Sequence, residues 1–161
     1  MALKVTDVVS GITEKDITNI TDTIKNLTVL RTKYQSAFGP QELDLLKREF
    51  IAHLQRLGVL YSKIRAYKGG NHNYCEEELK RIKAETIQEL KLTFKATSLS
   101  DAERIYPTDP TYQEKLILIR SLVKLFTKTE TLYSHFNMVL QSIIQSVSVA
   151  GKDKYASDFT S

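Results

Sequence analysis

The histidines and the single cysteine of this 161-residue chain are candidate metal ligands and nucleophiles. His53, His72 and His135 are far apart, and no HExxH motif accompanies them. A neighbouring histidine can activate a thiol, and His72 lies close to the single cysteine, Cys75. Two ligands on a loop are too few to hold a metal ion. The sequence therefore predicts a protein that is not an enzyme, with no cofactor and no metal site.

Cationic side chains offer a different chemistry, because they gather in two stretches without Asp or Glu. Residues 50–75 and 115–129 each carry a local charge of +4, although the whole chain carries only +4. Lys and Arg neutralise phosphates and release counterions, and aromatic rings stack on unpaired bases. Tyr61 is one candidate for stacking. The other residues predicted to bind nucleic acid are Arg56, Lys63, Arg65, Tyr67, Lys68, Tyr74, Arg120, Lys124 and Lys128.

The same residues also have an ordinary structural explanation. Lys and Arg commonly solvate the outer faces of helices, and Tyr67 falls on an apolar stripe that a core would use. The sequence leaves both interpretations open, and it does not place the two acid-free stretches on one surface.

Helices must position these residues. Hydrophobic residues make up 42% of the chain, and only three Pro and six Gly are present, which counts against an all-β fold. Apolar residues recur at steps of three and four, so we expect an all-α, elongated hairpin or bundle of about four helices. The predicted helices cover about residues 13–38, 41–68, 74–96 and 110–149. They form a single domain over residues 1–150, followed by a flexible tail over residues 151–161.

The helix ends carry recognisable signals. Thr13 and Asp16 have the spacing of a capping box, and Asp109 before a proline is a good N-cap for the last helix. The apolar stripes of the first and third helices extend to Phe38 and Phe94, which predicts both rings in the core. Gly151 is the expected stop of the last helix.

The last helix carries two adjacent apolar seams, which makes its apolar face unusually wide. One seam would pack on its own chain, and the other would build a homo-oligomer. A central helix surrounded within one domain is the alternative. The residues predicted at the oligomer interface are Leu118, Leu122, Leu125, Leu132, Phe136, Val139 and Ile143.

The second helix ends in a short motif, which is a lysine, any residue and an arginine, then an aromatic residue and a glycine turn, here Lys63, Arg65, Tyr67 and Gly69-Gly70. This motif resembles that of the UvsY family of phage recombination mediators. The resemblance covers residues 43–149. It implies a ring-forming, all-α homo-oligomer that binds single-stranded DNA through Lys63 and Arg65. It also implies a single-strand-binding protein and a recombinase as partners, in the bacterial host cytoplasm.

One departure concerns the end of the last helix. The family has a basic and aromatic segment there, whereas residues 145–150 contain no base. This leaves a C-terminal DNA or oligomer contact without support.

We therefore expect a non-enzymatic, single-stranded-DNA-binding recombination mediator that acts as a homo-oligomer. The alternative is a helical phage structural, scaffolding or regulatory adaptor that does not bind nucleic acid. No run of about 18 apolar residues is present, so no membrane partner is expected.

Overall fold

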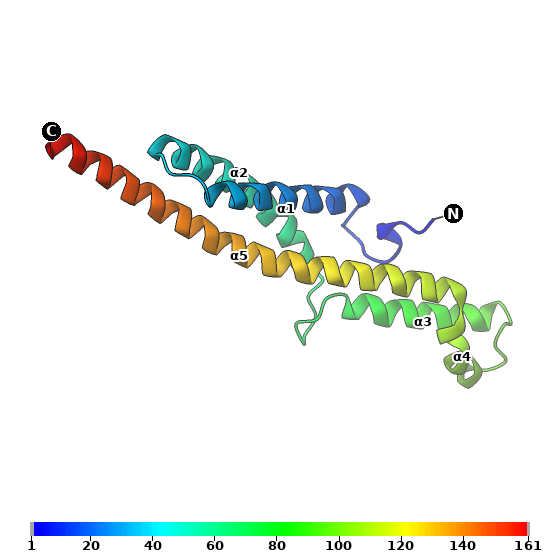
Figure 1. The fold of residues 1–161 in the computed structure, drawn as a ribbon. Helices are drawn as coiled ribbons and strands as arrows, with labels where there is room; N and C mark the ends of the chain where they lie inside the picture. Colours follow the sequence, from blue (N-terminus) through cyan, green and yellow to red (C-terminus); the bar gives the residue numbers. More distant parts are fainter. Residues whose placement is uncertain (1, 161) are drawn as a thin grey trace. The chain divides into compact units, whose positions relative to one another are not determined.

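The computed structural model describes residues 2–160, with side chains up to Gly151, and confirms the all-α fold. Within this described part there is no strand, and an isolated bridge joins Lys68 to Tyr74. The elements in chain order are η1 (Val5–Asp7), α1 (Glu14–Tyr34), α2 (Pro40–Arg65), α3 (Glu76–Leu92), α4 (Leu99–Ile105), η2 (Tyr106–Thr108) and α5 (Pro110–Thr160) (Figure 1).

The chain divides into two compact units, where the sequence predicts a single domain. Unit 1 comprises the chain up to Ile17 together with Lys63–Lys128, and unit 2 comprises Thr18–Ser62 and the chain from Thr129 onward. Helices α2 and α5 have 26 and 51 residues, and each contributes to both units. At 1.5 Å per residue, a helix of this length extends beyond a single small core.

Unit 2 is built from α1, α2 and the C-terminal part of α5, which lie side by side in Figure 1. Its core includes Leu27, and the rings of Phe50 and Phe136 meet edge to face with centroids 6.0 Å apart. Each phenylalanine is fully buried, so this contact joins α2 to α5 through large apolar surfaces. The hydroxyl groups of Tyr34 and Ser146 lie 2.6 Å apart and add a polar contact between α1 and α5.

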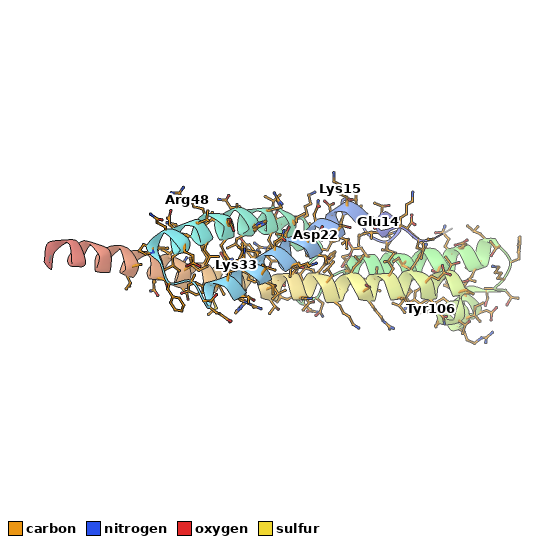
Figure 2. All side chains as sticks on the ribbon, turned by 45° about the horizontal axis from the view of Figure 1, so that its top comes forward. Glu14, Lys15, Asp22, Lys33, Arg48 and Tyr106 are labelled. Atoms are coloured by element: carbon orange, nitrogen blue, oxygen red, sulfur yellow. The ribbon has the colours of Figure 1, made fainter. Side chains whose placement is uncertain are left out.

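Unit 1 is built from α3, α4 and the N-terminal part of α5 (Figure 1), together with the N-terminal segment. The Arg81 guanidinium donates a hydrogen bond of 2.9 Å to the Val8 carbonyl and ties that segment to α3. At the other end of α3, Leu90 packs with Ala102 of α4. Tyr106, labelled in Figure 2, packs against these residues, so a small satellite core supports the turn between α3 and α5.

Two of the expected helix starts are confirmed. The Thr13 amide donates to the Asp16 carboxylate at 3.0 Å, and the Asp16 amide donates to the Thr13 hydroxyl at 3.2 Å. These reciprocal bonds form the capping box. The Asp109 carboxylate accepts a hydrogen bond of 2.9 Å from the Tyr112 amide, so Asp109 caps α5 as expected.

Three expectations about helix ends were wrong. Helices α1 and α3 end at Tyr34 and Leu92, earlier than predicted, so Phe38 and Phe94 leave their stripes and are 83% and 91% exposed. Helix α5 continues through Gly151 to Thr160, so the predicted flexible tail over residues 151–160 is helical. A single glycine lowers helix stability by about 1 kcal/mol relative to alanine, which does not by itself end a long helix.

The predicted oligomer seam on α5 is only partly available to a partner. Leu122, Phe136 and Ile143 are buried within the single chain, so their assignment to an oligomer interface was wrong. Phe136 is the clearest case, because it packs on Phe50 of the same unit. The seam residues that remain half-buried are Leu118, Leu125, Leu132 and Val139.

Candidate nucleic-acid interface

The segment between α2 and α3 forms a tight, hydrogen-bonded loop rather than a loose linker. The Gly69 amide donates to the Asn73 carbonyl at 2.7 Å, and the Cys75 amide donates to the Tyr67 carbonyl at 2.8 Å. A Cβ at Gly69 would lie 2.6 Å from Oε2 of Glu76 and 3.1 Å from the Asn73 carbonyl oxygen, so glycine allows both groups to approach the backbone closely. The loop therefore holds the residues of the Lys63–Gly70 motif in a defined conformation.

The tyrosines of this segment are used for packing. Tyr74 is only 4% exposed, and its ring meets the buried ring of Phe126 edge to face at 5.7 Å. Tyr67 is half-buried and lies 6.1 Å from the same ring. The prediction that Tyr74 stacks on a base was wrong, because α5 covers its ring. In unit 2, Tyr61 is half-buried and packs on Tyr133 at 5.1 Å.

Lys63 and Arg65 have different surroundings despite their short separation. The Lys63 ammonium forms an ion pair of 3.2 Å with the Asp16 carboxylate. The hydrogen bond from the Thr13 amide holds the pKa of Asp16 below its usual value, and Lys63 lowers that pKa further. Arg65 is exposed, and no carboxylate of a described residue lies within ion-pair distance of it. Positions two apart project from different sides of a helix, so the two cations do not form one pair.

Three cations of α5 form a second group, which we call the basic stripe: Arg120, Lys124 and Lys128. All three are exposed, and none has an acidic partner among the residues that the structure describes. Their four-residue spacing places them along one side of α5 at intervals of about 6 Å. Phe126 faces the core, two positions from both lysines, so the stripe lies on nearly the opposite side of the helix.

Unit 1 contains most of the predicted cations, but the basic stripe lies on the side of α5 away from Phe126, whereas the loop of Tyr67 and Tyr74 packs on the Phe126 side. The contacts of Tyr67 and Tyr74 with Phe126 join the two acid-free stretches within this unit. Lys68 is half-buried, and its ammonium lies 6.0 Å from the centre of the Tyr74 ring. Arg56 is exposed but belongs to unit 2.

Sequence reasoning missed two further exposed cations of unit 1, Lys91 and Lys95. Lys91 lies in the last turn of α3 and Lys95 three residues beyond its end, on either side of Phe94 in the chain. Neither has an ion-pair partner among the described residues. The available signal was the segment Lys91-Leu-Thr-Phe-Lys95, in which an aromatic residue lies between two lysines. Its interpretation as the end of a core stripe concealed that signal.

The His72 and Cys75 pair is not arranged as a reactive site. His72 is exposed, whereas Cys75 is fully buried. Burial, together with the smaller effect of the nearby Glu78 carboxylate, raises the pKa of the Cys75 thiol to about 12. Across the described residues, no group of three metal-ligating side chains is present. His53 is half-buried, with no hydrogen-bond partner at its Nδ1 atom within the described part of the chain.

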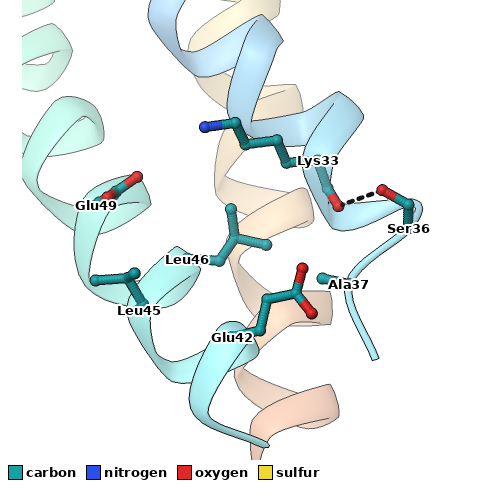
Figure 3. Close-up of a pocket in the computed structure, with 7 residues that line it drawn as sticks. All are labelled: Lys33, Ser36, Ala37, Glu42, Leu45, Leu46 and Glu49. Atoms are coloured by element: carbon teal, nitrogen blue, oxygen red, sulfur yellow. Dashed lines mark hydrogen bonds between the residues drawn. The ribbon is translucent and has the colours of Figure 1, made fainter. Parts of the chain in front are cut away.

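A hollow of about 360 Å³ in unit 2 lies between the end of α1 and the start of α2 (Figure 3). Its carboxylates come from Glu42 and Glu49, and Leu46 supplies an apolar wall. The Ser36 hydroxyl donates to the backbone carbonyl of Lys33 at 3.2 Å and does not bond to the Lys33 amine. A serine is activated by a base that accepts its proton, so this contact does not make a nucleophile.

Comparison of the chain with protein-family models, curated proteins and solved structures finds no match. Among the described residues, no helix contains a stretch long and apolar enough to cross a bilayer.

Proposed function

We propose that this protein is a non-enzymatic, single-stranded-DNA-binding recombination mediator. The basic stripe carries this proposal, because three exposed cations in a row lack carboxylates that would neutralise them. In a duplex strand, phosphates follow one another about every 3.4 Å along the axis. A single strand can extend toward the interval of about 6 Å between the stripe residues. Arg65 and Lys68, from the same unit, supply further cations.

The resemblance to the UvsY family supports the mediator part of the proposal. By this resemblance, Lys63 and Arg65 contact DNA, and the protein loads a recombinase and contacts a single-strand-binding protein. The ion pair with Asp16 makes Lys63 the weaker candidate of the two, since a phosphate would have to compete with a carboxylate 3.2 Å away. Arg65 is therefore the stronger candidate from this motif.

Self-association belongs to the same proposal. The half-buried side chains Leu118, Leu125, Leu132 and Val139 of α5 leave apolar surface that a second copy would cover. A homo-oligomer, for example a ring, would repeat the basic stripe in each copy and increase affinity through multivalency. We propose that the protein acts in the bacterial host cytoplasm.

Fluorescence anisotropy with a labelled oligo-dT and a matched duplex tests the DNA-binding claim. We expect tighter binding to the single strand and a steep loss of affinity as salt rises, because the lysine and arginine side chains of the protein displace counterions from the DNA when they bind. No binding to either DNA at low salt would contradict the proposal. Light scattering would report the assembly state of the same preparation.

A helical adaptor is the second candidate, favoured by a groove in unit 2. This groove of about 590 Å³ lies between the end of α1 and α5, and Leu43, Phe38 and Val149 line it. Phe38 and Val149 are exposed apolar residues of the kind that a partner helix would cover. Retention of a protein partner by a preparation that binds no DNA would favour this candidate.

A further inference from the structure

Phe94 combines two features that the folded chain alone does not require. Its ring is 91% exposed, and its backbone has a φ of 58°. Left-handed backbone is unfavourable for a residue with a bulky side chain, and glycine or asparagine usually takes this position after a helix. An exposed phenylalanine there carries a conformational cost and gains no core contact. Such an outlier points to a role outside folding.

The chain on both sides of Phe94 fixes the ring outward. The Phe94 amide donates to the Lys91 carbonyl at 3.2 Å, and the Ala96 amide donates to the Leu90 carbonyl at 3.0 Å. Ala96 is buried against Leu90 and Ala102 two residues after the exposed ring. This turn anchors the backbone in the core of unit 1 while it leaves the ring in solvent.

The charges around the ring favour an anionic partner. Lys91 and Lys95 flank Phe94, and neither forms an ion pair with a described residue. Glu89 and Asp109 line a small hollow together with Lys95, but neither forms an ion pair with it. Asp101 is engaged by the Arg104 guanidinium at 2.6 Å. The local surface therefore presents an open aromatic face between two free cations.

Other aromatic rings of unit 1 do not offer such a face. Tyr74 and Phe126 are buried, and Tyr67, Tyr106 and Tyr112 are half-buried in ring contacts. Among the described residues of this unit, Phe94 is the aromatic side chain exposed to solvent. Proteins that bind single strands combine cations along the backbone with exposed aromatic rings on which bases stack.

We propose that Phe94 is a base-stacking platform for single-stranded DNA, with Lys91 and Lys95 on the phosphates beside the stacked base. This inference rests on the proposed function and assigns it an aromatic contact in place of the covered tyrosines. Because every base has an aromatic face, the contact tolerates any sequence. Leu92 and Leu99, two and five residues from Phe94 in the chain, are also exposed apolar side chains.

A tryptophan reporter tests stacking directly, because the chain contains no tryptophan. In Phe94→Trp the indole is the single source of tryptophan fluorescence, and we expect oligo-dT to quench it as the base stacks. The matched control is Phe38→Trp, which places an indole at a similarly exposed position of unit 2. We expect little quenching there. Equal quenching of both reporters, or of neither, would overturn the inference.

Substitutions of Phe94 distinguish base stacking from a purely apolar contact through their effects on the affinity for oligo-dT. Phe94→Asn suits the left-handed backbone, so it removes the ring without new strain. We expect about 5- to 150-fold weaker binding to oligo-dT, the range for loss of one base–aromatic stack. Phe94→Tyr keeps an aromatic face and should bind like wild type. Phe94→Leu keeps an apolar side chain without an aromatic face and should bind as weakly as Phe94→Asn.

The outcomes distinguish this inference from the proposed function. Wild-type protein that binds oligo-dT with steep salt dependence, while Phe94→Asn binds equally well, overturns the stacking role and leaves the function standing. Wild-type binding by Phe94→Leu together with weak binding by Phe94→Asn also overturns stacking and assigns the position to an apolar contact. Failure of wild-type protein to bind any single strand overturns both.

Discussion

Removal of the basic stripe should reduce the salt dependence of DNA binding by an amount that the structure defines. The perturbation is the triple variant Arg120→Gln/Lys124→Gln/Lys128→Gln. All three side chains are exposed on one side of α5, so their replacement leaves the core around Phe126 intact. Glutamine keeps much of each aliphatic stem and a high helix propensity, so we expect a folded protein.

The magnitude follows from the number of phosphates neutralised. For a single strand, each contact contributes about 0.7 to the slope of log affinity against log salt. If Arg65, Lys68, Lys91, Lys95 and the three stripe residues each contact one phosphate, the wild-type slope is about −4.9 and the variant slope about −2.8. Between about 50 mM and about 200 mM salt, wild-type affinity should fall about 900-fold and that of the variant about 50-fold.

The assay is fluorescence anisotropy with oligo-dT over that salt range. The matched control removes three positive charges from unit 2 through Lys25→Gln/Lys33→Gln/Arg48→Gln; Lys33 and Arg48 are labelled in Figure 2. Both triple variants have the same net charge, so a difference between them reports position rather than total charge. A wild-type slope in the stripe variant, or equal slopes in both variants, would refute the assignment of phosphate contacts to α5.

Three further predictions concern packing, the thiol and acid stability. A Cβ at Gly58 would lie 3.1 Å from the Tyr133 hydroxyl. Alanine favours the helix by about 1 kcal/mol, but this tight contact offsets the gain, so Gly58→Ala should leave the free energy of unfolding in urea nearly unchanged in wild type. In a Tyr133→Phe background, which lacks the hydroxyl, the same substitution should raise that free energy by about 1 kcal/mol. Equal effects in the two backgrounds would contradict this contact. With its pKa raised to about 12, the Cys75 thiol should react with a disulfide reagent about 1,000-fold more slowly in the folded protein than in urea at about pH 8. Fast labelling of the folded chain would show that the thiol is accessible. Because the pKa of Asp16 lies below 3.8, its stabilising contribution is complete at neutral pH and is lost as pH falls through that lowered value. Melting temperatures below about pH 4 should therefore decline less in Asp16→Asn than in wild type, and parallel declines would argue against this role.

The stretches of regular periodicity were predictable because helix packing is largely a local pattern. The α2 seam is a clear example, since Leu46, Phe50 and Leu57 are buried as their spacing predicts. The caps at Asp16 and Asp109 were predictable for the same reason, because each bonds to the backbone three residues away. The ends of α1 and α3 were not, because the apolar spacing continues to Phe38 and Phe94 after the hydrogen-bonded helix has ended.

The candidate interface likewise combines residues that the sequence identifies with a contact that only the structure shows. The two acid-free stretches, and hence the exposed cations Arg65 and Lys124, can be counted in the sequence alone. The ion pair of Lys63 with Asp16 joins positions 47 residues apart, so no local motif indicates it. The sequence therefore identified the cations, and the structure distinguished the paired one from the free ones.

The sequence by itself determined that this protein is helical, where its main apolar faces lie and that its positive charge is concentrated in two stretches. Only the tertiary structure decided which aromatic rings are available to a ligand. Tyr74 is covered by Phe126, which is distant in sequence and comes from another helix, whereas Phe94 is exposed because the chain turns before its stripe is complete. The reason is physical: helix periodicity depends on neighbours within a few residues, but burial of a ring depends on what distant part of the chain packs against it.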